Sequence, residues 1–141
     1  MRNYTIIARK DAIKSNASYY LDKENANLGW SLFSGDINND TFEDLLIGSP
    51  IYSDTNLYQN GALFIILNSN GSGLVLEDLN VEKQADFVVR PPSGCTRARF
   101  GHSVAVLDLN LDGVNDLVVG APSYNLENII YEVNKILLII V

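Results

Sequence analysis

Two nine-residue stretches of the chain place an oxygen-bearing side chain at positions 1, 3, 5 and 9. The first stretch contributes Asp36, Asn38, Asp40 and Asp44, and the second contributes Asp108, Asn110, Asp112 and Asp116. The backbone carbonyls of Phe42 and Val114, at position 7, are placed to complete each set. Because Ca²⁺ takes roughly 6–8 oxygen ligands from carboxylates, amides, carbonyls and water, this pattern predicts two Ca²⁺ sites.

Two other interpretations use the same residues. Asn and Asp favour ordinary solvated turns, but two copies in register favour the metal sites. A helix-flanked EF-hand requires Glu at position 12, where this chain has Ile47 and Val119. Gly113 suits the sharpest point of the second loop, and Thr41 takes that place in the first. The sequence therefore predicts tighter binding at the second loop.

The two stretches belong to a longer internal repeat. Each matched residue is displaced by 72 positions, from Asp36 to Asp108 and from Gly48 to Gly120. The match continues upstream, where Gly29 pairs with Gly101. A fixed period of this length is typical of repeat architectures.

Short apolar runs rich in β-branched residues alternate with polar turns along the chain. We expect strands near residues 4–9, 28–34, 43–48, 61–67, 85–90, 100–107, 116–121 and 135–141. No helical periodicity is convincing, and only residues 76–89 are ambiguous. Four strands per repeat predict an all-β fold of about two propeller blades, each with four antiparallel strands.

The same landmarks predict the organisation of the chain. Residues 28–99 form a first blade and residues 100–141 an incomplete second blade, whereas residues 1–27 are the end of a preceding blade or an irregular lead-in. Since blade faces need neighbouring blades, we expect the chain to be a piece of a longer propeller. The rival hypothesis is a small β domain that pairs with copies of itself.

Composition narrows the classes of partner. The net charge is −7, and six of the 17 acidic residues lie in the two loops as proposed ligands. An acidic balance argues against nucleic acid and anionic membrane as partners. No apolar stretch reaches 18 residues, so no transmembrane segment is expected. The single histidine, His102, and the single cysteine, Cys95, do not suggest a catalytic set, and we assign no catalytic residue.

Several motifs resemble a known family. Phe100-Gly101, the second acidic loop and Gly120-Ala121-Pro122 together are similar to the FG-GAP repeat, which builds the seven-bladed propeller of integrin α subunits. The first copy departs from that motif, with Leu28-Gly29 and Gly48-Ser49-Pro50. Within the family, residues 99–123 are most similar to the C-terminal propellers of glycosylphosphatidylinositol-specific phospholipases D.

The resemblance implies a secreted, Ca²⁺-binding, non-catalytic propeller that joins a separate catalytic domain. Zn²⁺ would belong to that domain and not to this chain. The implied partners are the remaining blades and a protein or glycolipid-anchored ligand. The alternative is a propeller fragment of an integrin α-like or other FG-GAP adhesion protein.

Four Asn-x-Ser/Thr sequons begin at Asn3, Asn16, Asn39 and Asn70. Asn70, in a Gly/Ser-rich turn, is the best candidate for glycosylation on sequence grounds. Asn39 lies inside the first acidic loop, and we expect it to be a poor acceptor once a metal orders that loop.

Overall fold

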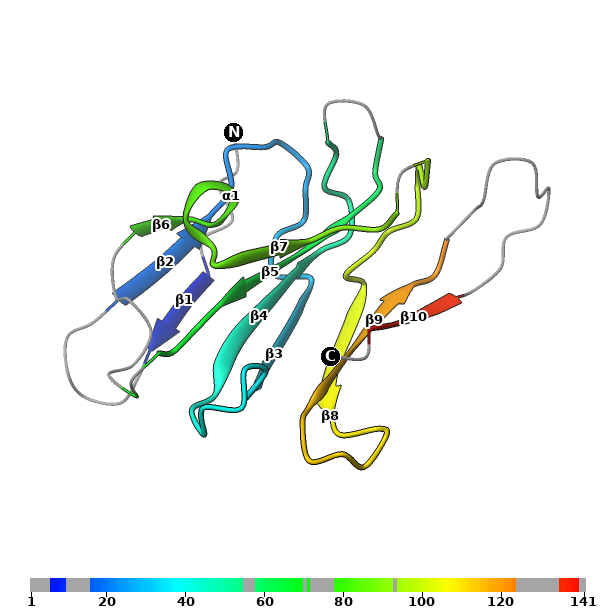
Figure 1. The fold of residues 1–141 in the computed structure, drawn as a ribbon. Coiled ribbons are helices and arrows are strands. Elements are labelled where there is room, and N and C mark those ends of the chain that lie inside the picture. The colour runs from blue at the N-terminus through cyan, green and yellow to red at the C-terminus, as the bar shows by residue number, and fades with distance from the viewer. Residues whose placement is uncertain are drawn as a thin grey trace.

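The computed structural model describes residues 6–9, 16–54, 58–69, 71, 78–92, 94–123 and 135–139. The described elements are almost all strands, as the sequence predicts. In chain order they are β1 Ile6–Arg9, β2 Asn16–Tyr20, β3 Ser31–Gly35, β4 Asp44–Ser49, β5 Ala62–Ile66, β6 Asp78–Asn80, α1 Val81–Gln84, β7 Phe87–Val89, β8 Ser103–Leu107, β9 Asp116–Ala121 and β10 Lys135–Ile139. They form three sheets (Figure 1).

The central sheet has the strand order β3-β4-β5-β7, and every neighbouring pair is antiparallel. Strand β5 is a continuous apolar run whose every residue is buried, and β4 has a buried or half-buried apolar centre, Leu45–Ile47. Strands covered on both faces lose the alternation of polar and apolar residues for this reason. The predicted blade of four antiparallel strands is therefore confirmed for the first repeat.

The second repeat forms the sheet β10-β9-β8, which is also antiparallel. Its register matches that of the first sheet, because Ser31 lies opposite Gly48 in one and Ser103 opposite Gly120 in the other. The first strands of the two repeats, β3 and β8, contact each other. The two blades thus stand side by side in the same orientation (Figure 1).

A third sheet has the order β1-β2-β6. It contains the strand predicted near residues 4–9, which is β1, and two strands that the sequence did not predict, β2 and β6. Strand β6 follows β5 in the chain but pairs in parallel with β2. The next residues form the single turn of α1, where the Asn80 side chain accepts from the amide of Glu82 at 3.1 Å. This turn lies within residues 76–89, the stretch that was ambiguous in the sequence. Its start is specified by the Asn80 cap and not by a repeated pattern of apolar residues.

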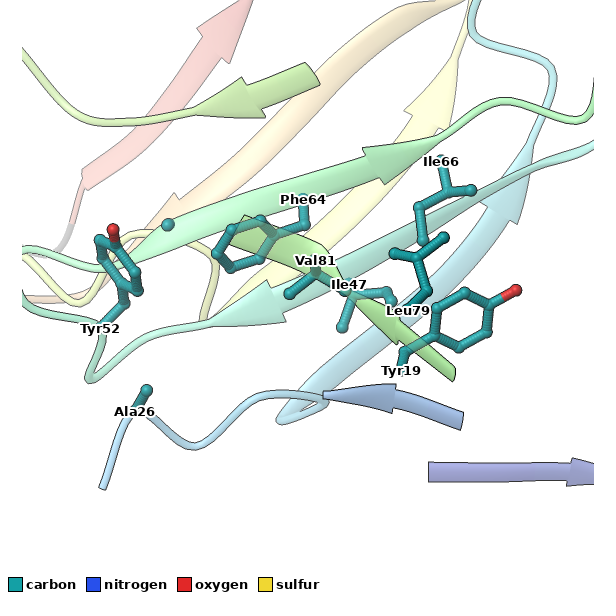
Figure 2. Packing of buried hydrophobic residues seen from close by; sticks show 9 residues of the cluster. Tyr19, Ala26, Ile47, Tyr52, Phe64, Ile66, Leu79 and Val81 are labelled. Carbon is teal, nitrogen blue, oxygen red and sulfur yellow. The ribbon is translucent and has the colours of Figure 1, made fainter. Parts of the chain in front are cut away.

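Two hydrophobic clusters hold the sheets together. The first joins the lead-in and α1 to the central sheet, with Tyr19, Tyr52, Phe64 and Val81 each at most 2% exposed (Figure 2). The second lies between the two repeats and contains Leu46, Leu63, Phe100 and Val119. Blade packing therefore uses both faces of the central sheet, and burial of these side chains is the main stabilising term.

Phe100 and Gly101 form the joint between the blades. Phe100 is fully buried, and its amide donates to the carbonyl of Asn60 at 3.0 Å. Gly101 has φ +83°, a conformation that glycine adopts at little cost. The Phe-Gly pair thus fills the core with one residue and turns the backbone with the next. No helix in the described part of the chain is long and apolar enough to cross a membrane.

Candidate metal-binding loops

Both acidic loops connect the first two strands of a blade. Residues 36–43 link β3 to β4, and residues 108–115 link β8 to β9. The two loops lie at the same end of the sheets, at the bottom of the view in Figure 1. The ninth residue of each pattern, Asp44 or Asp116, is already the first residue of a strand.

In the first loop, the acidic side chains accept hydrogen bonds from the backbone of the loop itself. The Asp36 carboxylate accepts from the amides of Asp40 at 3.1 Å and Thr41 at 2.8 Å. The Asn38 carbonyl oxygen accepts from the Asp40 amide at 3.1 Å, while its Nδ2 donates to Asp40 Oδ2 at 2.9 Å. Asp40 Oδ1 accepts from the Phe42 amide at 2.9 Å. The side chains at positions 1, 3 and 5 are therefore joined in one network.

The second loop repeats this network bond for bond. Asp108 accepts from the amides of Asp112 at 3.1 Å and Gly113 at 2.9 Å. Asn110 accepts from the Asp112 amide at 2.9 Å, and its Nδ2 donates to Asp112 Oδ2 at 2.7 Å. Asp112 Oδ1 accepts from the Val114 amide at 2.8 Å. Two loops that differ at positions 2, 4, 6, 7 and 8 thus fold identically because they share the polar residues.

The backbone is wound the same way in both loops. At position 4, φ is +60° for Asn39 and +61° for Leu111. At position 6, φ is +75° for Thr41 and +89° for Gly113. Gly113 therefore lies where a positive φ is required. Thr41 adopts the same region with a β-branched side chain, which is strained.

The carboxylates at position 9 are buried, unlike the others. Asp44 is 1% exposed and Asp116 is 0% exposed. Asp44 accepts from the amides of Ile37 at 3.1 Å and Asn68 at 2.8 Å, and Asp116 accepts from the Leu109 amide at 2.9 Å. A buried carboxylate is costly unless it is hydrogen-bonded or close to a cation. Each loop therefore has one fixed, desolvated acidic group at its base.

The loops offer oxygen donors but not a preassembled cluster of acidic groups. Among the described residues, no three His, Cys, Asp or Glu side chains group as a metal cluster. The donor set of each loop instead mixes Asp with Asn and backbone groups. A carboxylate has about four lone-pair directions, so oxygens that accept one N–H bond keep further acceptor capacity. The set suits a hard cation with an adaptable coordination shell, which is the behaviour of Ca²⁺.

The structure adds a residue that the repeat pattern does not indicate. Asn115, at position 8 of the second loop, donates from Nδ2 to the backbone carbonyl of Asp36 at 2.8 Å. The corresponding residue of the first loop, Glu43, instead accepts from Ser34 within its own blade. Because position 8 differs between the repeats, comparing them could not reveal this contact between blades.

The remaining polar residues considered from the sequence lie elsewhere. The His102 ring lies 5.3 Å from the Trp30 ring between centroids, and the two residues occupy equivalent positions in the repeats. They directly precede β8 and β3, at the opposite end of these strands from the loops. Cys95 is a free thiol, 1% exposed, within the cluster between the blades.

Comparison with known proteins agrees with the repeated architecture. The FG-GAP repeat family matches residues 28–66 and 100–134, which is more than half of the chain. The chain is 44% identical over 117 residues to phosphatidylinositol-glycan-specific phospholipase D from Bos taurus, covering 82% of this chain and 13% of the relative. The Homo sapiens protein of that name is 40% identical over 128 residues, covering 89% and 15% respectively.

Integrin alpha-3 from Cricetulus griseus is a weaker match, with 34% identity over 98 residues, which cover 69% of this chain and 8% of the integrin. The chain thus spans about an eighth of the length of the phospholipase relatives. The repeated loop, the matched strand register and the family match lead to one assignment. The chain belongs to the FG-GAP repeat family.

Proposed function

We propose that each acidic loop binds one Ca²⁺ ion and that the ions stabilise the propeller. One observation carries this proposal: the two loops hold the same Asp and Asn side chains in the same hydrogen-bonded turn, although the intervening residues differ. The first ion would use Asp36, Asn38, Asp40, Asp44 and the Phe42 carbonyl. The second would use Asp108, Asn110, Asp112, Asp116 and the Val114 carbonyl.

The proposed ions act on folding and not on a reaction. Each loop joins two strands of one blade, and its position-9 carboxylate is buried at the start of the second strand. A Ca²⁺ ion would offset two of the three negative charges that each loop carries within nine residues. Binding to a site that exists only in the folded chain contributes directly to folding free energy.

Calorimetric titration of Ca²⁺ into the full-length protein tests the ligand assignment. We expect Asp112→Ala to remove one site and Asp40→Ala to remove another, with tighter binding at the second loop. Glu24→Ala is the matched control, because this exposed acidic residue lies outside both loops. Unchanged stoichiometry in Asp112→Ala and Asp40→Ala would show that the ligands are assigned wrongly.

We further propose that the chain is a non-catalytic propeller segment of a secreted, phosphatidylinositol-glycan-specific phospholipase D-like protein. The 40–44% identity to relatives of that name supports this parentage. Our assignment of the loops to scaffolding predicts that Asp108→Ala with Asp116→Ala lowers folded yield more than turnover. The test is specific activity per folded molecule. A loss beyond about tenfold in a normally folded double variant, roughly 1.4 kcal/mol of barrier, would place the loops in the chemistry.

The second candidate is a propeller segment of an integrin α-like adhesion protein, which the 34% identity to integrin alpha-3 supports. In that case we expect binding to a protein ligand and no phospholipase activity in the full-length protein. Assay of the full-length protein on a glycosylphosphatidylinositol-anchored substrate separates the two candidates.

A further inference from the structure

Thr41 is the residue of the first loop that the cation site does not explain. Its φ of +75° places a β-branched side chain in the left-handed region, where such residues are genuine outliers. The second loop has Gly113 at this position, and a Cβ built there would meet nothing within 4 Å. The turn therefore has room for a side chain, but its backbone favours glycine. A threonine here calls for a role of its hydroxyl group.

We propose that Thr41 serves as the third residue of an occupied N-glycosylation sequon, Asn39-Asp40-Thr41, with the glycan on Asn39. Both Asn39 and Thr41 are exposed, in a loop at the end of the sheet. Asn tolerates the observed φ of +60° better than most residues. A sequon acceptor is expected in such a surface loop of a secreted protein.

The residue at position 4 is exposed in both loops. Leu111 occupies this position in the second loop and is 86% exposed, the largest value among the exposed large apolar residues of the described chain. The loop hydrogen bonds use the side chains of Asp36, Asn38 and Asp40, and none of those found in the described residues uses the Asn39 side chain. A glycan on Asn39 would therefore leave the proposed cation donors in place, contrary to the expectation from the sequence.

The other sequons differ in their setting. Asn16 begins β2, which is paired on both sides, with β1 and β6. Ser18 is the third residue of this sequon, and its hydroxyl donates a hydrogen bond to Asp78. The sequons at Asn3 and Asn70 include residues outside the described part of the chain. Among the sequons that are fully described, only that of Asn39 is in an exposed loop.

The transfer uses a co-substrate of the secretory pathway. Asn39 Nδ2 forms a bond to C1 of a lipid-pyrophosphate-linked oligosaccharide, the amide loses one proton, and the lipid pyrophosphate leaves. The Thr41 hydroxyl, two residues along, completes the acceptor motif that this transfer requires. The inference rests on the secretory part of the proposed function, and the test below supplies its own leader so that the two can fail separately.

The full-length protein is expressed behind a heterologous secretion leader in a eukaryotic cell. The secreted protein is deglycosylated enzymatically in ¹⁸O water, which converts a glycosylated Asn into labelled Asp. Trypsin leaves Asn39 and Asn70 on one peptide, residues 24–83, because no Lys or Arg precedes Lys83 there. Cleavage after Phe33 and Phe42 isolates residues 34–42, whose only sequon is that of Asn39. Fragment ions distinguish Asn39 from the neighbouring Asn38.

We expect the label on Asn39 in the wild-type chain and in Thr41→Ser, which keeps the hydroxyl. We expect its loss in Asn39→Gln and in Thr41→Gly. The double variant Leu111→Asn, Gly113→Thr builds a sequon in the second loop at similar backbone angles. We expect this variant to acquire the label at position 111. Absence of label on Asn39 in the secreted wild-type protein overturns the proposal, whether or not Asn70 is labelled. Ca²⁺ titration of Asn39→Gln reports on the cation proposal independently.

Discussion

The side-chain amide of Asn115 donates a 2.8 Å hydrogen bond to the backbone carbonyl of Asp36, 79 residues earlier in the chain. Asp36 is the first proposed ligand of one loop, and Asn115 directly precedes Asp116, the last proposed ligand of the other. The contact therefore fixes the entry of the first loop by means of the second. Two sites that share such a contact are expected to be energetically coupled.

Replacing Asn115 tests this coupling. We expect Asn115→Ala to reduce the free energy of unfolding by about 1 kcal/mol, the typical value of one hydrogen bond. We also expect it to weaken Ca²⁺ binding at the first loop, although the substitution lies in the second. Denaturant unfolding and calorimetric titration measure the two effects. Glu43→Ala is the control, because Glu43 bonds to Ser34 within its own blade. Equal effects of both substitutions on both loops would contradict the coupling.

Thr41 and Gly113 form a natural exchange experiment at equivalent positions. We expect Thr41→Gly to stabilise the fold and Gly113→Thr to destabilise it, each by about 1 kcal/mol, because a non-glycine residue in a strained region costs roughly 1–3 kcal/mol. The entropy that glycine adds to the unfolded chain reduces the first gain. Midpoints of urea unfolding with and without Ca²⁺ measure both variants. A destabilised Thr41→Gly protein would show that Thr41 makes a compensating contact.

The sequence predicts the repeated sheets well because their information is local. Strand β5 is an uninterrupted apolar run bounded by Gly61 and Asn68, so its type and limits follow from composition alone. The positive φ of Gly113 likewise follows from its place in the turn. Periodicity and turn chemistry are sufficient for features of this kind.

The remaining features depend on contacts between distant residues. Strand β6 has only three residues and is defined by its parallel pairing with β2, about 60 positions earlier in the chain. The Asn115 contact depends on how β3 and β8 stand beside each other. Neither relationship leaves a periodic trace in the sequence. The loop donors could be identified from the sequence because they lie within nine residues of each other. Asn115, which links the two loops, could not be identified in this way.

Two equivalent glycines differ in how closely the neighbouring blade approaches. A Cβ on Gly48 would lie 2.1 Å from the backbone oxygen of Gly101, whereas a Cβ on Gly120 would meet only the Ser103 hydroxyl at that distance. A hydroxyl can rotate away, but the backbone of the blade joint cannot. We expect Gly48→Ala to destabilise by about 1–3 kcal/mol, as overpacking does, and Gly120→Ala by clearly less. Thermal unfolding of both variants tests this order, and a reversed order would contradict the close approach of the blades.

A charged cluster attaches α1 and the lead-in to the central sheet. Lys23 Nζ lies 2.9 Å from Glu82 Oε1 and donates to the hydroxyl of buried Tyr52 at 3.0 Å. The Tyr52 hydroxyl donates to Glu82 at 2.8 Å. Burial alone raises the pKa of the Glu82 carboxyl, but the hydrogen bonds from Lys23 and Tyr52 lower that pKa overall. Burial likewise lowers the pKa of Lys23, while its bonds to Tyr52 and Glu82 raise it overall.

These directions predict how stability depends on pH. Because the pKa of Glu82 is lower in the folded state, its stabilising contribution is complete above the ordinary value of 4.5 and is lost as pH falls through the folded value. Because the pKa of Lys23 is higher in the folded state, its contribution is complete below 10.5 and is lost as pH rises through the folded value. The cluster should therefore stabilise the fold fully at neutral pH.

Glu82→Gln removes the charge and keeps an oxygen that accepts from Tyr52. We expect it to lower the free energy of unfolding at pH 7 by about 1 kcal/mol, since the Lys23–Glu82 pair is partly buried. The difference from wild type should shrink as pH falls below 4.5, where the wild-type carboxyl becomes protonated as well. Glu24→Gln is the matched control, because this exposed acidic residue lies outside the cluster and should contribute little at any pH. Urea unfolding between pH 3 and pH 7 measures both variants. A constant difference between Glu82→Gln and wild type over this range would mean that packing, and not the charge on Glu82, links α1 to the blade.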